Sequence, residues 1–253
     1  MTQNSLSNSE TESTNRVVSL DSSDAIQSRE SIQQMAEVKS LGTDELDRRK
    51  IIYPGTLDRG LLDAFRNLRT TLVQKGGRQN FVVLVSSVCP KGGGTFVGLN
   101  LAAAFALDSS KTSLIIDCNV LEPQLDGMLS MPPDYGLIDF LEDPNIQIDD
   151  IIYSSGIPRL RMIPAGRRSE LGPELFSSAR MHSLIAGLRQ RYEDRYIILD
   201  VPSLDSSAEV RVLAEVCDQA LLVVPHGRVT QAQIMAATDV VGRNKLSGVV
   251  FNN

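Results

Sequence analysis

The chain has 253 residues, of which 42% are hydrophobic and 22% are charged, and its formal net charge is −6. These values suit one globular domain with a sizeable core plus a tail; they exclude a wholly disordered chain, and no apolar run approaches the roughly 18 to 20 residues that cross a bilayer. Residues 1–45 hold eight acidic and three basic side chains, so the remainder is nearly neutral and lacks the basic surplus that binds nucleic acid.

The N-terminal region has the composition of a tail. It begins MTQNSLSNSE, with neither the basic region nor the apolar stretch of a signal peptide, so we expect a cytoplasmic protein. Its Ser-rich, acidic composition buries too little apolar surface to offset the entropy of ordering the chain. We therefore predict a disordered tail over residues 1–45 and a folded domain over residues 46–253. Within the tail, residues 25–38 have the approximate apolar spacing of a short helix that would form against a partner.

Beyond the tail, apolar periodicity predicts alternating helices and strands. Residues 61–73 place Leu61, Phe65, Leu68 and Leu72 on one apolar stripe, which predicts a helix. The expected strands are 81–87, 112–117, 160–165, 196–200, 219–225 and 246–251. The expected helices are 96–107, 181–192, 208–216 and 230–241. Continuously apolar strands separated by helices indicate the α/β class, with a mainly parallel sheet flanked by helices on both faces.

A Gly-rich loop joins the strand at 81–87 to the following helix. In such a loop the backbone N–H groups and the positive end of the helix both point at a bound anion. The loop reads Lys91-Gly92-Gly93-Gly94-Thr95. Thr95 stands where a P-loop places the hydroxyl that holds Mg²⁺, but Gly94 stands where the Walker A lysine normally contacts the outer phosphates. These five residues are candidate ligands for ATP or ADP with Mg²⁺, and the loss of the lysine leaves no cofactor certain.

Two aspartates follow apolar strands further along the chain. Asp117 and Asp200 lie where P-loop proteins place the carboxylates that organise the metal ion or orient water. Taken singly, each is explained by an ordinary turn or helix cap. In the same chain as the Gly-rich loop, they become candidate site residues.

These elements, in this order, resemble the bacterial tyrosine kinases (BY-kinases) of capsule and exopolysaccharide biosynthesis. They are most similar to the CpsD/CapB and Wzc cytoplasmic-domain type, within the ParA/MinD-like P-loop class. The resemblance covers roughly residues 51–253 and includes DAFRNLRTTL (63–72), NLAAAFA (100–106), LIIDCNVLEP (114–123), GLIDFLED (136–143) and ALLVVPHGRVT (220–230). It implies a P-loop fold, an ATP-dependent autokinase site, and a membrane co-polymerase or chain-length protein as a partner at the inner face of the plasma membrane.

The chain departs from the family's pattern in the two motifs that handle phosphate and metal. Where the family has approximately Pro-Gly-Glu-Gly-Lys-Ser/Thr, this chain has Gly94 at the lysine position and Lys91 three residues earlier. In the family's Ile-Asp-x-Asp-x-Arg-x-Pro motif, Asn119 replaces the second aspartate and Leu121 replaces the arginine. Loss of one good electrostatic contact commonly costs about 10² to 10³ in rate, so two losses predict a vestigial site without useful turnover.

Lys91 has two interpretations that the residues leave open. Its amine either folds back to replace the missing charge, or it faces solvent on a loop that holds no nucleotide. The first interpretation keeps nucleotide binding, and the second makes the three glycines a relic of a phosphate loop.

The resemblance also implies an oligomer. Asp63, Arg66 and Arg69 match the family's Glu-x-x-Arg-x-x-Arg helix, with Asp in place of Glu, and that helix packs into a neighbouring subunit to close a ring. Their spacing of three places all of them along one helix flank. Without the resemblance, the same pattern would describe a solvated helix face.

Three functions compete for this chain. The leading hypothesis is a catalytically degenerate BY-kinase-like protein, a pseudokinase, that regulates or scaffolds polysaccharide export by binding a membrane co-polymerase or a related tyrosine kinase. The alternative is an active tyrosine autokinase or ATPase that uses Lys91 and Asp200. A ParA-like positioning protein would usually need a basic or membrane-binding surface, and the nearly neutral domain argues against it.

Overall fold

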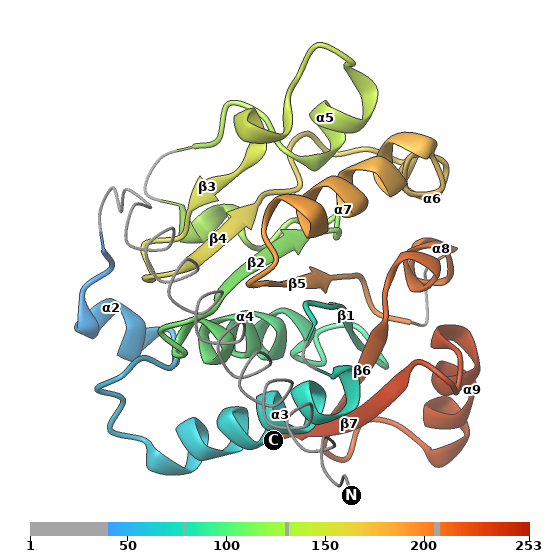
Figure 1. Ribbon diagram of the computed structural model, residues 1–253. Helices are drawn as coiled ribbons and strands as arrows, with labels where there is room; N and C mark the ends of the chain where they lie inside the picture. Colours follow the sequence, from blue (N-terminus) through green and yellow to red (C-terminus); the bar gives the residue numbers. More distant parts are fainter. Residues whose placement is uncertain (1–39, 78, 130–131, 205–207) are drawn as a thin grey trace, which may run out of the picture.

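The computed structural model describes residues 40–77, 79–129, 132–204 and 208–253. A seven-stranded sheet has the strand order β3-β4-β2-β5-β1-β6-β7 (Figure 1). Neighbouring strands pair in parallel, except that β3 is antiparallel to β4. The strands are β1 (Val82–Ser87), β2 (Thr112–Asp117), β3 (Tyr153–Ser154), β4 (Leu160–Ile163), β5 (Arg195–Asp200), β6 (Gln219–Pro225) and β7 (Leu246–Asn252).

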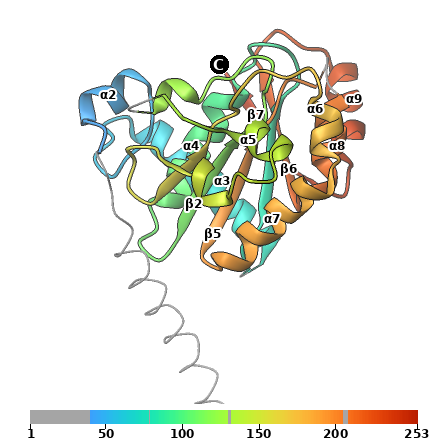
Figure 2. The same ribbon diagram turned by 90° about the horizontal axis from the view of Figure 1, so that it is seen from above.

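Helices cover both faces of this sheet, so the predicted α/β architecture is confirmed. One face is covered by α2 (Thr43–Arg48), α3 (Arg59–Gly76) and α4 (Gly94–Ala106). The other is covered by α5 (Leu137–Glu142), α6 (Gly172–Phe176), α7 (Ala179–Arg191), α8 (Ala208–Val216) and α9 (Gln231–Val241). In Figure 2, α6, α8 and α9 lie on the opposite side of the molecule from α2. Two short 3₁₀ helices, Asp126–Met128 and Ile148–Ile151, lie in the connections.

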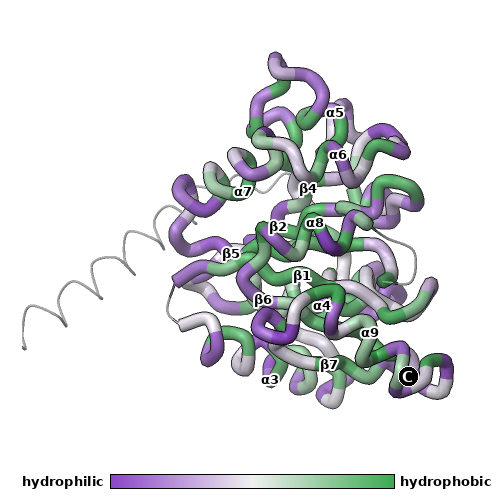
Figure 3. The backbone as a smooth tube through the Cα atoms, turned by 90° about the vertical axis from the view of Figure 1, so that its right-hand side faces the viewer, coloured by the Kyte–Doolittle hydropathy of each residue, from purple (hydrophilic) through white to green (hydrophobic). Residues whose placement is uncertain are grey.

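The central strands are buried on both of their faces. In β1, Val82 and Leu84 pack into the core under α5 to α9, whereas Val83 and Val85 pack into the core under α2 to α4. All four side chains are fully buried, and the central strands are mostly hydrophobic in Figure 3. Two-sided burial explains why these strands are continuously apolar in the sequence rather than alternating.

The amphipathic helix predicted over 61–73 is α3. It is 18 residues long, buries Leu62, Phe65 and Leu72, and begins where the Asp58 side chain accepts the N–H of Leu61 at 2.9 Å. In the described ranges, no helix is both long and apolar enough to cross a membrane.

The other predicted elements are found close to their expected bounds, with a few additions. The elements α5, α6 and β3 were not predicted, because segments of two to six residues are too short for periodicity to show. The helix α2 begins at Thr43, inside the range predicted as tail. Residues 1–39, including the short helix predicted over 25–38, lie outside the described residues.

Asn100 is a buried polar side chain that ties the start of the domain to α4. Its Oδ1 accepts the N–H of Ile52 at 2.9 Å, and its Nδ2 donates to the carbonyl oxygens of Lys50 and Phe96, each at 3.1 Å. The residue is fully buried. The bond to the N–H of Ile52 is buried, so its loss would leave that donor shielded from water.

We expect Asn100→Ala to lower the free energy of unfolding by about 2 to 4 kcal/mol. The substitution leaves the buried N–H of Ile52 without a partner, at about 1 to 3 kcal/mol, removes two partly buried hydrogen bonds, and opens a cavity. Urea denaturation measures the change. Asn67→Ala, on the exposed flank of α3, is the matched control and should stay within about 0.5 kcal/mol of the natural protein. Equal effects of the two substitutions would contradict the role given to Asn100.

Candidate functional site

The Gly-rich loop lies at the carboxyl end of β1, where the chain turns into α4. The N-cap of α4 is Gly93, at φ +91°, and Lys91 also has a positive φ of 55°. A non-glycine residue at positive φ is uncommon, and its contacts with the rest of the structure must hold it there. The predicted strand, loop and helix are therefore present in the order that a phosphate-binding loop requires.

Two side chains contact this loop from its outer side. Arg228, just after β6, donates through its two terminal nitrogens to the carbonyl oxygens of Pro90 and Lys91, each at 2.8 Å. Asn252, at the end of β7, donates through Nδ2 to the carbonyl of Gly92 at 3.2 Å. No role was predicted for either residue, because these contacts join positions more than 130 residues apart in the sequence. Only the HGRVT segment of the family resemblance pointed to Arg228.

Asp117 and Asp200 lie side by side at the same edge of the sheet. They face each other in the parallel register of β2 and β5, and both are buried. The carboxylate of Asp117 is directed at its own connection, where Oδ1 accepts the N–H of Asn119 and Oδ2 accepts those of Gln124 and Leu125, each at 3.0 Å. Burial nevertheless raises the pKa of Asp117 to about 6, and the nearby Asp126 adds to the rise.

Asp200 is the less satisfied of the two aspartates. Within the described part of the chain, neither of its carboxylate oxygens accepts a hydrogen bond of good geometry, although the Thr95 hydroxyl is close enough to stabilise its charge. Burial, reinforced by the charge of Asp117, raises the pKa of Asp200 well above its ordinary value, and the Thr95 side chain opposes that shift in part. A buried carboxylate with free oxygens beside a hydroxyl, at the N-terminus of α4, is the arrangement that could hold a hydrated magnesium ion.

The loop offers amides to a phosphate group but no cation at the start of the helix. Gly94 is buried, and a Cβ built there would lie 3.3 Å from the backbone nitrogen of Ser87. A side chain at this position therefore needs only a small shift of its neighbours. Lys91 is exposed. Asp200 and Thr95 therefore suit the Mg²⁺ ion of an ATP–Mg²⁺ complex, whereas Gly94 supplies no positive charge to its outer phosphates.

The predicted interface residues lie on α3, away from the phosphate-binding loop. Asp63 and Arg66 are exposed, with side chains 67% and 45% accessible, and their charged groups are 3.9 Å apart. Arg69 instead donates to the carbonyl oxygen of Ala104, in the last turn of α4, at 3.0 Å. Two of the three side chains are thus presented outward, and their use as an interface stays a prediction.

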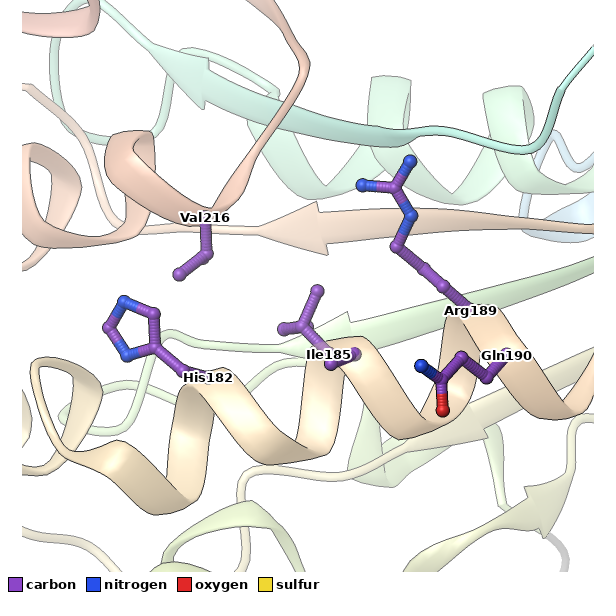
Figure 4. Close-up of a pocket in the computed structure, with 6 residues that line it drawn as sticks. His182, Ile185, Arg189, Gln190 and Val216 are labelled. Atoms are coloured by element: carbon purple, nitrogen blue, oxygen red, sulfur yellow. The ribbon is translucent and has the colours of Figure 1, made fainter.

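A separate hollow lies on the other face of the molecule, between α7 and the end of α8. Figure 4 shows His182, Ile185, Arg189 and Gln190 on α7, with Val216 facing them. Ala186 completes the lining. None of the predicted site residues contributes to this hollow.

Comparisons with known proteins find similarity to bacterial tyrosine kinases, and no protein-family model matches the chain. It is 26% identical over 191 residues to the tyrosine-protein kinase CpsD of Streptococcus agalactiae serotype III (strain NEM316), covering 74% of this chain and 80% of CpsD. It is 27% identical over 201 residues to the succinoglycan biosynthesis transport protein ExoP of Rhizobium meliloti, covering 75% of this chain and 24% of ExoP.

The fold is similar to that of solved bacterial kinase domains and of ParA/MinD-type ATPases. The kinase domain of the Escherichia coli tyrosine kinase ETK superposes with a TM-score of 0.71 at 21% identity, covering 89% of this chain and 92% of that domain. The cell division ATPase MinD of Pyrococcus furiosus superposes with a TM-score of 0.55 at 20% identity, covering 68% and 70%.

The fold is thus that of the α/β domains of ParA/MinD-type ATPases and of bacterial tyrosine kinases. The similar proteins include a tyrosine-protein kinase and a succinoglycan biosynthesis transport protein, which confirms the resemblance found in the motifs of this chain.

The two aspartates should respond differently to removal of their charge. An aspartate whose pKa is higher in the folded than in the unfolded protein binds more protons when folded, so the free energy of unfolding falls as pH rises from about 4 toward the folded pKa. Asp200 is such a group. We therefore expect Asp200→Asn to be more stable than the natural protein at pH 8, with a smaller difference at pH 5, in urea denaturation at both values.

Asp117→Asn is the matched comparison for that experiment. Its amide nitrogen would face backbone N–H donors of its own connection, so it should stabilise the protein less than Asp200→Asn does. An Asp200→Asn variant that is less stable than the natural protein at pH 8 would contradict the unpartnered, charge-destabilised state assigned to Asp200.

Proposed function

We propose that this chain is a BY-kinase-like protein without kinase activity, a pseudokinase that serves capsule or exopolysaccharide biosynthesis as a regulatory or scaffold subunit. The observation that carries the proposal is the start of α4, where Gly94 stands at the position of the lysine that contacts the outer phosphates in the family. Phosphoryl transfer depends almost entirely on positioning and on charge stabilisation, so loss of that cation removes a large part of the catalytic effect.

The motif after β2 supports the same proposal. Asn119 and Leu121 stand where the family has an aspartate and an arginine, and Leu121 is 47% exposed. Asp117 is already hydrogen-bonded to three backbone N–H groups of its own connection. Asp117 thus has a structural role, because its carboxylate holds the connection that follows β2.

The partner proposed from the family resemblance is a membrane co-polymerase or chain-length protein, or a related tyrosine kinase. Asp63 and Arg66 on α3 offer exposed charges of both signs for such a contact, or for a ring of copies of this chain. Binding to that partner would bring a cytoplasmic protein to the inner face of the plasma membrane.

An active ATP-binding kinase or ATPase is the second candidate, and one observation favours it. Asp200 keeps two free carboxylate oxygens beside Thr95, as a magnesium site would need. In this candidate Lys91 supplies the missing charge, although its side chain is exposed on the loop.

Calorimetric titration with ATP and with ADP, with and without Mg²⁺, separates the two candidates. We expect no binding heat from the natural protein, because no cation faces the outer phosphates. Gly94→Lys should gain measurable binding, since its Cβ fits with only a small shift. Gly94→Gln, of similar length but uncharged, is the matched control and should not gain it. Tight binding by the natural protein would favour the enzyme.

Polysaccharide output in the source bacterium tests the scaffold. After deletion of the gene, the natural chain and Asp200→Asn should restore output equally. The double charge reversal Asp63→Arg with Arg66→Glu should not, because it inverts the charges proposed for the contact. Arg243→Glu, an exposed charge reversal on the far side of the sheet from α3, is the control and should restore output. Failure of Asp200→Asn alone would contradict the proposal.

A further inference from the structure

Three consecutive carbonyl oxygens of the Gly-rich loop are hydrogen-bonded from outside the loop. Arg228 holds those of Pro90 and Lys91, each at 2.8 Å, and Asn252 holds that of Gly92 at 3.2 Å. Arg228 lies in the turn after β6, and Asn252 is the last residue of β7. The loop after β1 is therefore hydrogen-bonded to residues at the carboxyl ends of β6, the next strand in the sheet, and of β7, the strand beyond it.

The loop has a backbone conformation that needs such support. Lys91 is held at φ 55°, a left-handed conformation that a residue with a Cβ rarely adopts. Gly93 is at φ +91°, and the Nδ2 of Asn252 occupies the space a side chain there would need, only 2.1 Å from an ideal Cβ position. The Asn252 amide thus packs directly against the turn into α4.

Further backbone hydrogen bonds join the ends of β6 and β7 to each other and join β6 to the start of the loop. The N–H of His226 donates to the carbonyl of Asn252 at 2.9 Å, which joins the turn after β6 to the end of β7. The N–H of Val88 donates to the carbonyl of Val223 at 2.9 Å, which joins the start of the loop to β6. The guanidinium of Arg228, which follows β6 directly, makes two charge-assisted hydrogen bonds with the loop, and these are stronger than bonds between neutral groups.

We propose that Arg228 and Asn252 lock the Gly-rich loop in one conformation from its outer side, so that the loop keeps its shape without a bound nucleotide. Their bonds fix the carbonyl side of the peptide groups, whereas an anion would be held from the N–H side. The lock is independent of the scaffold proposal, because it holds whether or not the opposite side of the loop binds a ligand.

The test is ¹⁵N relaxation of the nucleotide-free, full-length protein. We expect the amides of Lys91, Gly92 and Gly93 to have order parameters of about 0.85, the value of rigid backbone, in the natural protein. In the double variant Arg228→Gln with Asn252→Ala, the same amides should fall below about 0.6. Arg228→Lys keeps the charge but cannot make the bidentate contact, so its loop amides should have order parameters between these two values.

Controls separate loss of the lock from loss of the fold. Arg243→Gln removes another exposed arginine, one paired with Asp239, and should leave the loop amides at about 0.85. Order parameters in β1 and β6 should be unchanged in every variant. Loop amides that are already below about 0.6 in the natural protein, or that stay near 0.85 in the double variant, would overturn the proposal. Adding ATP with Mg²⁺ to the same sample tests the proposed function separately.

Discussion

Parallel strands that are buried on both faces leave little of the sheet open to solvent except its edges and the loops at its ends. In this chain the side chains of β1 divide between two cores, one under α2 to α4 and the other under α5 to α9. The predicted phosphate and metal residues lie at the carboxyl ends of β1, β2 and β5, where open parallel sheets commonly bind ligands. The Gly-rich loop, Asp117 and Asp200 meet there because β1, β2 and β5 run parallel and end at the same edge of the sheet.

The electrostatic balance at that edge is unusual for a phosphate site. Two buried aspartates lie next to each other, and the start of α4 offers backbone N–H groups but no lysine. The carboxylate of Asp117 accepts hydrogen bonds from backbone N–H groups. Among the described residues, the carboxylate of Asp200 accepts no hydrogen bond of good geometry, and burial disfavours its charged form. Arg228 contacts the loop, but its guanidinium donates to loop carbonyl oxygens. The same residues thus account for a preserved fold and for a site poor in positive charge.

The sequence was informative wherever periodicity and local motifs determine the structure. The strands β2 and β6, the amphipathic α3, and the order of strand, loop and helix around Gly93 all follow from short-range patterns. The contacts made by Arg228 and Asn252 could not be predicted, because parallel pairing brings the ends of distant strands together. The short elements α5 and α6 left no periodic trace, and the inward bond of Arg69 to Ala104 required knowing how α3 packs on α4.

Hydrolysis of ATP in the presence of Mg²⁺, compared between the natural protein and Asp200→Asn, tests the central claim most directly. If Gly94 has removed the charge on which phosphoryl transfer depends, both proteins should release phosphate at the same background rate, with no phosphotyrosine formed. Phosphate release or phosphotyrosine above that background, abolished by Asp200→Asn, would contradict the account and show that the site is a working enzyme.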